Sequence, residues 1–393
     1  MDAGDFTTDA PGELVDTVVD GQQVPAFVPD DLSADVVDDG RFVTEVGQAM
    51  RATGKLDVVG PMAGSNRMLV EAFARKEAVQ SSRIEGTEVT LSDMYRYEAR
   101  QSAGETTRDD DGARQATNYL AALDFGLRAI ENGDPITTDL LCDMHRTLLE
   151  GVRSGDPDPG AVRDSQNYIA PFEGAPIARA TFVPPPPDEA REKLATLLDF
   201  ANGSQSIHPL VKIGLVHYQF ETLHPFRDGN GRLGRLLISL ELQREELLGR
   251  PYLYFSAYFN EHRPDYIRLL DDVRQRGEWE TWIHFFLRGI WTQAQEAQER
   301  ASRLTDLRRA YTDRYQDHRS PYIVPLTHRL FENPYITATE AQRALECSHQ
   351  TAYNLIETLR EDGVLVEAED SGEHTLFYAE EIYDVLDDPV EGR

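Results

Sequence analysis

The sequence predicts a mainly α-helical protein with a small β-hairpin in its helical core and a small α+β domain near its C-terminal end. Apolar residues recur at spacings of three and four over most of the chain between residues 65 and 318, which is the helical period. Prolines interrupt that period between residues 157 and 187, and a separate pattern of short elements begins after Ser320-Pro321. The length of 393 residues suggests two or three domains.

The composition is strongly acidic, with 39 basic residues against 69 acidic ones and a formal net charge of −30. Nearly all the basic side chains are arginines, because the chain has only four lysines. Such a surface suits very high salt, where the Debye length falls to about 3 Å and self-repulsion is screened. We therefore expect that the protein comes from a halophilic organism. The alternative is an acidic protein from an organism that lives at ordinary salt concentrations.

The sequence carries no sign of a membrane or of an oxidising compartment. No apolar run approaches the roughly 20 residues that span a bilayer, and the acidic first residues lack the basic start of a signal peptide. The two cysteines, Cys142 and Cys347, fit no metal-ligand spacing and are not expected to pair. We expect a cytoplasmic protein that does not contact a membrane.

The first half of the chain predicts an arm followed by helices. Residues 1–45 are rich in Asp, Gly, Pro and Val with little periodicity, which indicates an extended or loosely packed arm. A helical pattern begins near Ser65 and ends at Gly86, a natural helix C-cap. Two more helices are expected around 113–131 and 138–150.

The proline-rich interruption predicts a short hairpin with exposed edges. Its strands are expected at Arg163–Ile169 and Thr181–Val183, because prolines exclude a central strand or a helix on either side. The four prolines at 184–187 stiffen the exit from this hairpin before a helix that starts near Asp188.

The stretch from His224 to Arg235, H-P-F-R-D-G-N-G-R-L-G-R, lies between two helical patterns. The preceding apolar run includes Leu210 and Phe220, and the following one begins at Leu233. The glycines therefore form a helix–loop–helix junction in which the loop opens into a helix N-terminus.

This junction has the chemistry of a phosphate site. Free N–H groups and the dipole at a helix N-terminus attract anions, and Gly229 and Gly231 allow close backbone approach. Arg232 and Arg235 carry guanidinium groups, which match phosphate oxygens. Asp228 has a carboxylate, which is a suitable ligand for Mg²⁺ beside phosphates. His224 has an imidazole, which can accept a proton near neutral pH.

The glycines admit two other interpretations. Gly229, Gly231 and Gly234 also spell G-x-G-x-x-G, but the dinucleotide fingerprint follows a β-strand and this one follows a helix. The second alternative is a solvated basic loop without a ligand.

The same stretch resembles the signature of Fic-domain proteins, H-x-F-x-[DE]-G-N-G-R-x-x-R, with every fixed position filled. The resemblance implies a Fic-type helical core and transfer of AMP from ATP to a Tyr, Ser or Thr hydroxyl of a protein. It implies that His224 is the general base, that Phe226 packs beneath the loop and that Asp228 holds Mg²⁺. The residues that it assigns to the nucleotide are Gly229, Asn230, Gly231, Arg232, Leu233, Gly234, Arg235 and, near the adenine, Tyr258. For Tyr258 a packed core tyrosine is the equal alternative.

Two further features follow from the resemblance. The segment S-S-R-I-E-G is similar to the inhibitory motif [ST]-x-x-x-E-[GN] of many Fic proteins, with Ser81, Glu85 and Gly86 in the fixed places. Glu85 would pair with Arg235 and occupy the arginine that should hold the γ-phosphate; a surface charge near a helix end is the alternative. The hairpin would act as a flap that aligns the target backbone by strand addition.

The C-terminal pattern resembles a winged helix-turn-helix. Helices are expected at Leu326–Glu332 and His349–Asp362, with a capping box of Thr337 and Glu340 between them and a hairpin turn at Ser371-Gly372. DNA binding stays open, because residues 321–393 hold four arginines, no lysine and sixteen acids. A protein-binding or dimerising role is favoured.

We thus expect four regions: an N-terminal arm and inhibitory helix (1–110), a Fic core (111–300), a linker helix (301–320) and a winged-helix domain (321–393). The expected function is a protein adenylyltransferase inhibited by Glu85, which uses ATP and Mg²⁺ and acts on a protein substrate, the chain itself included. A homodimer is compatible with this function. The alternatives are a nucleotide-sensing transcriptional regulator that binds DNA and a hydrolase that removes AMP from proteins.

Overall fold

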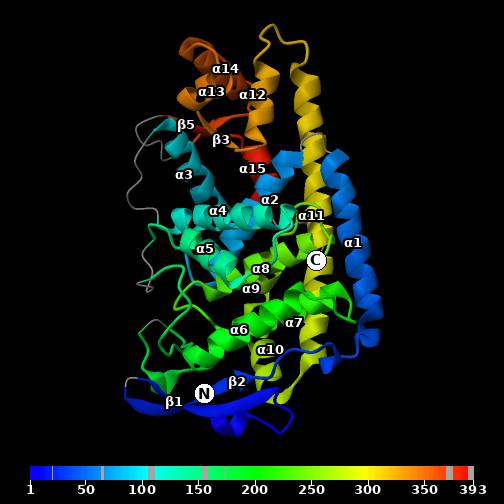
Figure 1. Cartoon of the computed structure of the whole chain (residues 1–393). Helices are drawn as coiled ribbons and strands as arrows, with labels where there is room; N and C mark the ends of the chain where they lie inside the picture. Colours follow the sequence, from blue (N-terminus) through cyan, green and yellow to red (C-terminus); the bar gives the residue numbers. More distant parts are fainter. Residues whose placement is uncertain are drawn as a thin grey trace. The chain divides into compact units, whose positions relative to one another are not determined.

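The computed structural model describes residues 1–19, 21–62, 66–104, 111–152, 158–172, 174–368 and 375–387, and it is mainly helical, as predicted (Figure 1). The chain forms two compact units. Unit 1 comprises Met1–Thr53, Asn118–Gly249 and Phe255–Thr292, and unit 2 comprises Gly54–Thr117, Arg250–Tyr254 and Gln293–Arg393. Within the described ranges, no helix has both the length and the apolar character that a membrane crossing requires.

The elements divide between the units as follows. Unit 1 holds η1 (Ala3–Asp5), β1 (Gly12–Val19), β2 (Gln22–Pro29), η2 (Ala34–Val36), η3 (Asp39–Phe42), α5 (Thr138–Leu148), η4 (Ile177–Arg179), α6 (Pro187–Asn202), α7 (Pro209–Leu223), α8 (Asn230–Arg244), α9 (Ser256–Glu261) and α10 (Arg263–Arg276). Unit 2 holds α2 (Asn66–Ile84), α3 (Leu91–Ala103), α12 (Ile323–Leu330), β3 (Tyr335–Thr337), α13 (Ala338–Ala344), α14 (His349–Glu361), β4 (Val366–Glu367), β5 (Leu376–Tyr378) and α15 (Glu380–Asp387). Helices α1 (Val43–Met62), α4 (Asp111–Glu131) and α11 (Trp279–Tyr315) contribute residues to both.

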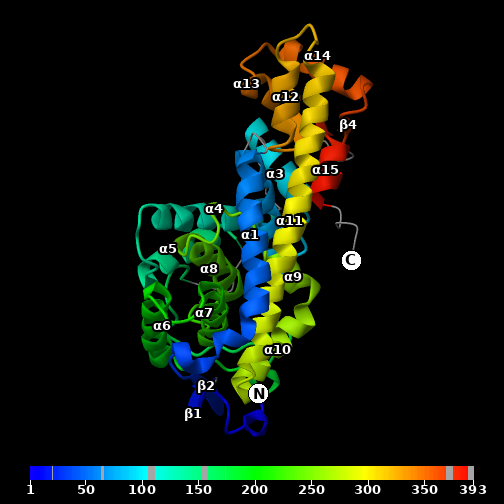
Figure 2. The same ribbon diagram turned by 90° about the vertical axis from the view of Figure 1, so that its right-hand side faces the viewer.

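The core of unit 1 is built around α7. Every residue of this helix from Leu210 to Leu223 is buried, which is the pattern of a helix surrounded by protein on all sides. It packs against α6 and α8 (Figure 2), and Trp282 of α11 donates its indole N–H to the Gly214 carbonyl at 2.9 Å. The loop that follows α7 is therefore attached to the most buried element of the unit.

The N-terminal segment is more ordered than the loosely packed arm that we expected. Strands β1 and β2 pair antiparallel from Gly12↔Pro29 to Val19↔Gln22. The signal that could have found them is the Asp20-Gly21 dipeptide between two apolar runs, a strong hairpin indicator.

The flap hairpin is shorter than predicted. Within the described part of this segment, its two arms are joined by one antiparallel bridge, Ile169↔Phe182, and the 3₁₀ helix η4 lies between them. Prolines account for the difference, because they cannot donate to a strand ladder. They flank both arms at Pro171, Pro176 and Pro184.

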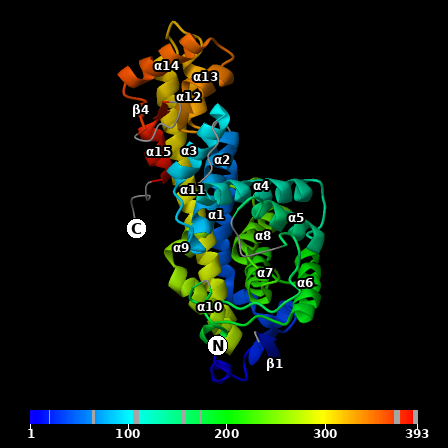
Figure 3. The same ribbon diagram turned by 90° about the vertical axis from the view of Figure 1, so that its left-hand side faces the viewer.

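The C-terminal part of unit 2 contains the predicted helices and strand pair, together with strand β3 and helix α15, which the sequence did not indicate. A three-stranded sheet in the order β3-β5-β4 accompanies α12, α13 and α14. Helix α3 of the same unit contacts β3 (Figure 1) and α13 (Figure 3), and Ser92 and Tyr335 share a hydrogen bond of 2.8 Å. The predicted turn at Ser371-Gly372 lies outside the described residues.

The expected capping box forms in part. Thr337 accepts a hydrogen bond from the Glu340 N–H at 3.1 Å, while the Glu340 carboxylate lies 3.4 Å from Arg329. Burial raises the pKa of this carboxyl to about 7, although Arg329 lowers it in part.

Glu340 predicts a pH-dependent stability in unit 2. Because its folded pKa lies above the unfolded value, its contribution is fully present below about pH 4.5 and is lost as the pH rises through about 7, by about 3 kcal/mol in all. Glu340→Gln should flatten this slope, measured by denaturant unfolding of the full chain with hydrogen exchange in residues 323–365. Glu332→Gln, beside the same arginine, is the matched control and should keep the slope; an unchanged slope in Glu340→Gln contradicts the assignment.

Candidate phosphate-binding loop and base

His224 ends α7 in a left-handed backbone conformation, with φ 45° and ψ 58°. Its N–H donates to the Phe220 carbonyl at 3.1 Å, so the last turn of α7 fixes its position. A residue other than glycine is uncommon in this conformation and is retained where its surroundings hold it. The His224 side chain is half-buried, which suits a base that must meet a substrate.

Asn230 closes the loop between α7 and α8. Its side-chain oxygen accepts from the Phe226 N–H at 2.8 Å, and its amide nitrogen donates to the Phe226 carbonyl at 2.8 Å. Asn230 and Phe226 are both buried. The side chain of Asn230 therefore shapes the loop, and any phosphate contact would come from its backbone N–H or its second amide hydrogen.

His145 of α5 contacts the loop between α7 and α8. Its ring stacks on Phe226 with centroids 4.1 Å apart. Its Nδ1 accepts from the Gly160 N–H at 2.8 Å, so its Nε2 carries the hydrogen and donates to the Asp228 carbonyl at 2.9 Å. His145 therefore contacts both the Phe226 ring and the loop backbone at Asp228.

Arg163 and Asn167, from the first arm of the flap, hold the backbone on either side of Pro225. The Arg163 Nε donates to the His224 carbonyl at 2.9 Å, and the Arg163 N–H donates to the Pro225 carbonyl at 2.9 Å. The Asn167 amide donates to the Phe226 carbonyl at 2.9 Å. Burial lowers the pKa of Arg163 to about 10, which leaves the guanidinium charged at neutral pH.

Helix α8 begins after Gly229, whose backbone is left-handed with φ 72°. The N-cap residue is this glycine and makes no side-chain cap hydrogen bond, so the first-turn N–H groups keep the electrostatic character that attracts an anion. Arg232 and Arg235 of the first two turns are both buried, and the Arg232 guanidinium lies 3.5 Å from the Asp228 carboxylate. The loop thus joins a helix N-terminus, two arginines and a carboxylate.

Gly234 allows α7 and α8 to cross closely. A Cβ added there would lie 2.3 Å from Oε1 of Glu221 and 3.0 Å from the Phe220 ring. The Gly234 carbonyl meets Nδ1 of His217 at 3.1 Å, and burial lowers the pKa of His217 to about 3, so this imidazole stays neutral. The third glycine of the stretch is therefore a packing residue.

Family comparisons agree with this geometry. The model of the Fic/DOC family matches residues 135–242, and the model of its N-terminal region matches residues 43–128. The chain contains a Fic/DOC domain.

Curated relatives of this Fic/DOC chain carry adenylyltransferase names. A Caenorhabditis elegans protein named protein adenylyltransferase fic-1 is 30% identical over 138 residues, which are 32% of this chain and 24% of that protein. A probable protein adenylyltransferase from Aquifex aeolicus is 25% identical over 201 residues, 49% of this chain and 56% of that protein. The chain thus spans between about a quarter and just over half of these relatives.

Two solved structures share the fold. A Fic family protein from Desulfovibrio desulfuricans superposes with a TM-score of 0.55 at 22% identity, over 87% of this chain and 97% of that one. A Fic domain containing signaling protein from Bacteroides thetaiotaomicron gives a TM-score of 0.52 at 18% identity, over 67% and 97%. At these identities the likeness concerns the fold alone.

The remaining predicted residues lie on other elements. Tyr258 on α9 is 3% exposed and packs against His262 and Phe285, with centroids 4.4 and 5.0 Å away, which favours the core alternative for this ring. Ser81 and Glu85 lie in unit 2 at the end of α2, followed by Gly86 with φ 89°. Their inhibitory role stays a prediction.

Gly234 and Gly47 form a matched pair for testing the close crossing of α7 and α8. Gly234→Ala should destabilise the Fic/DOC core by about 1–3 kcal/mol, because the new methyl group meets a buried carboxylate. Gly47→Ala, on α1 with open space around the added Cβ, should stabilise by about 0.5–1 kcal/mol. Denaturant unfolding measures both; equal effects would contradict the close crossing.

Proposed function

We propose that this chain is a protein adenylyltransferase that transfers AMP from ATP to a hydroxyl group of a protein. The observation that carries the proposal is the pairing of a half-buried His224 with an uncapped helix N-terminus and two buried arginines, all fixed by one closed loop. A triphosphate needs several donors and positive charges. A hydroxyl nucleophile needs a base within reach.

The proposed reaction is an in-line displacement at the α-phosphorus. The His224 side chain takes the proton of a Tyr, Ser or Thr hydroxyl, and the oxygen attacks the α-phosphorus. The new P–O bond forms as the bond to the leaving oxygen breaks, and pyrophosphate departs. Arg232 and Arg235 would hold the outer phosphates, and the first-turn N–H groups of α8 would stabilise the charge that develops.

The donor set at Asp228 fits Mg²⁺. The carboxylate is half-exposed, and one of its oxygens accepts from the Gly229 N–H at 2.6 Å, which leaves the other oxygen for a metal beside substrate phosphates. Mg²⁺ is bound in proteins through one or two carboxylates together with phosphates and waters. Bound there, the ion would supply positive charge to the phosphate oxygens.

We further propose that Glu85 restrains the activity. It occupies the fixed glutamate position of the inhibitory motif, at the end of an apolar-striped helix that can deliver it to a defined point. A carboxylate paired with Arg235 would leave that arginine with little to gain from a γ-phosphate. ATP could still bind, but its α-phosphorus would be out of line for attack.

For the C-terminal winged-helix-like region we propose a protein partner or a second copy of the chain. Three of its four arginines are engaged: Arg329 pairs with Glu332, Arg360 lies 2.8 Å from Glu357, and Arg343 donates to the Ser102 carbonyl. Together with the acid excess, this leaves little charge to neutralise a DNA backbone. A DNA-binding assay across salt concentrations separates this proposal from the alternative, a nucleotide-sensing transcriptional regulator that binds DNA.

His224 predicts a loss of transfer without a loss of ATP binding. His224→Ala should reduce AMP transfer by about 10²–10⁴-fold, because the nucleophile loses its base. Incubation with α-labelled ATP in molar KCl, with calorimetry of ATP binding, measures both quantities. AMP transfer by the variant at the wild-type rate would show that His224 is not the base.

Glu85 predicts activation on removal of its carboxylate. Glu85→Gly should increase self-labelling from α-labelled ATP by about ten-fold or more, because the proposed block is positional and leaves the catalytic groups intact. The double variant with His224→Ala should be silent, and Glu88→Gly, three residues on, is the matched control and should change little. Activity of Glu85→Gly at the wild-type level, in a folded variant that binds ATP, would contradict autoinhibition.

A further inference from the structure

The buried imidazole of His217 lies on α7, the helix that ends at His224, and the proposed reaction does not use it. We propose that His217 is a positioning residue for Arg235. It holds the backbone of α8 at the peptide group that precedes Arg235, and it thereby sets the affinity of the site for the outer phosphates of ATP. This inference rests on the proposed function, because it concerns the arginine that would hold those phosphates.

The hydrogen bonds of His217 assign the position of its proton. Burial keeps this imidazole neutral, so one ring nitrogen donates and the other accepts. The Gly234 carbonyl, 3.1 Å from Nδ1, can only accept, and Nδ1 therefore carries the hydrogen. Nε2 accepts from the Tyr266 hydroxyl at 2.9 Å. A chain of two hydrogen bonds thus joins α10 to α8 through α7.

Three aromatic rings fix the orientation of this imidazole. The rings of Phe259, Tyr266 and Trp282 stack with it at centroid distances of 5.4, 6.0 and 6.1 Å. The Trp282 ring is itself held by its hydrogen bond to the Gly214 carbonyl of α7. In a close-packed interior the imidazole cannot turn its Nδ1–H away from α8 without displacing these rings. Packing therefore sets the direction of the donor.

The hydrogen bond to α8 acts on Arg235 through a shared peptide group. The Gly234 carbonyl and the Arg235 N–H belong to one planar unit, so an anchored oxygen limits movement of the Arg235 backbone. Helix α7 also approaches Gly234 at a second point, where an added Cβ would lie 2.3 Å from Oε1 of Glu221. Arg235 is 2% exposed, and a buried side chain has little freedom to correct a shift of its backbone.

A neutral donor suits this position electrostatically. Burial is the largest cause of the low pKa of His217, the Gly234 carbonyl raises that pKa in part, and the positive charge of Arg235 lowers it. The imidazole is thus close enough to Arg235 to feel its charge. A carboxylate here would compete with phosphate for the guanidinium, and a cation would repel it. Neutral His217 anchors the backbone without either effect.

The role of the donor is tested with His217→Asn and His217→Leu in the Glu85→Gly background. The asparagine amide can replace Nδ1 as a donor to Gly234, whereas leucine has a similar size and no donor. His217→Leu should raise the apparent KM for ATP in self-labelling about ten-fold, because α8 loses its anchor and Arg235 its position. The rate of self-labelling at saturating ATP and the Kd for AMP should change by less than about two-fold, because neither depends on the outer phosphates. His217→Asn should match the parent.

Self-labelling kinetics with α-labelled ATP and calorimetry of ATP and AMP binding measure these quantities. The same KM for ATP in the leucine and asparagine variants would overturn the proposal. An equal loss of ATP and AMP binding in His217→Leu would also overturn it, since that is the result of a general loosening of the core.

The proton position is tested by ¹⁵N NMR of the histidines in the wild-type chain, which depends on neither transfer nor the folding of a variant. We expect the His217 ring with hydrogen on Nδ1 and none on Nε2 at neutral pH. Tyr266→Phe keeps the ring and removes the hydroxyl, so it should move the Nε2 resonance. Hydrogen on Nε2 in the wild type would overturn the anchor. If the Glu85→Gly parent transfers no AMP to protein, the proposed function fails, while NMR and calorimetry still decide the role of His217.

Discussion

Two hydrogen bonds between the Asn230 side chain and the Phe226 backbone hold together the loop on which the candidate site depends. They join the first residue of α8 to Phe226, which lies two residues after His224. The end of the most buried helix and the start of the next are thereby fixed relative to each other. Removing the side chain would leave a buried N–H and a buried carbonyl without these partners, which is the costly case for a hydrogen bond.

The electrostatics of the site follow from that closure. Helix α8 starts without a side-chain cap, and two arginines of its first turns are buried close to it. Buried cations and the positive end of a helix dipole together favour an anion with several oxygens. A triphosphate meets this requirement, and so would a carboxylate delivered to the same arginines. The same physical demand thus underlies both the proposed catalysis and the proposed inhibition by Glu85.

The site could be predicted from sequence where its residues are close along the chain. His224 to Arg235 supply base, carboxylate and arginines within twelve residues, and apolar spacing located α7 and α8. His145 and Arg163 could not be found this way, because they reach the loop across 83 and 61 residues and have no local motif. A histidine on an apolar helix face and an arginine before a loop have many ordinary explanations.

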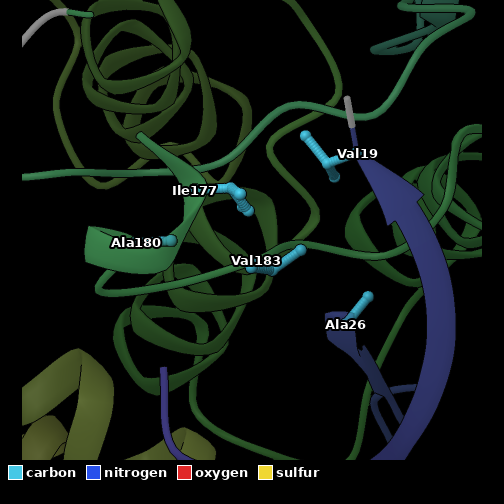
Figure 4. Close-up of a cluster of buried hydrophobic side chains, with 5 residues drawn as sticks. All are labelled: Val19, Ala26, Ile177, Ala180 and Val183. Atoms are coloured by element: carbon cyan, nitrogen blue, oxygen red, sulfur yellow. The ribbon is translucent and has the colours of Figure 1, made fainter. Parts of the chain in front are cut away.

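The remaining differences have specific physical causes. The N-terminal hairpin is stabilised by apolar contacts to a flap more than a hundred residues away (Figure 4), so its order was underestimated despite the Asp20-Gly21 turn signal. The side chain of Asn230 bonds the backbone of its own loop, a role that the sequence did not indicate, and its contact with a phosphate stays a prediction. Tyr258 faces other aromatic rings.

The central claim is that the loop directs a nucleophile to the α-phosphorus of ATP and retains AMP on the protein. The most direct measurement incubates the Glu85→Gly chain in molar KCl with ATP labelled either at the α-phosphorus or at the γ-phosphorus. We predict that the α-label stays on protein and that the γ-label leaves with pyrophosphate. Retention of the γ-label would indicate phosphoryl transfer instead, and retention of neither label by a folded, ATP-binding chain would contradict the account.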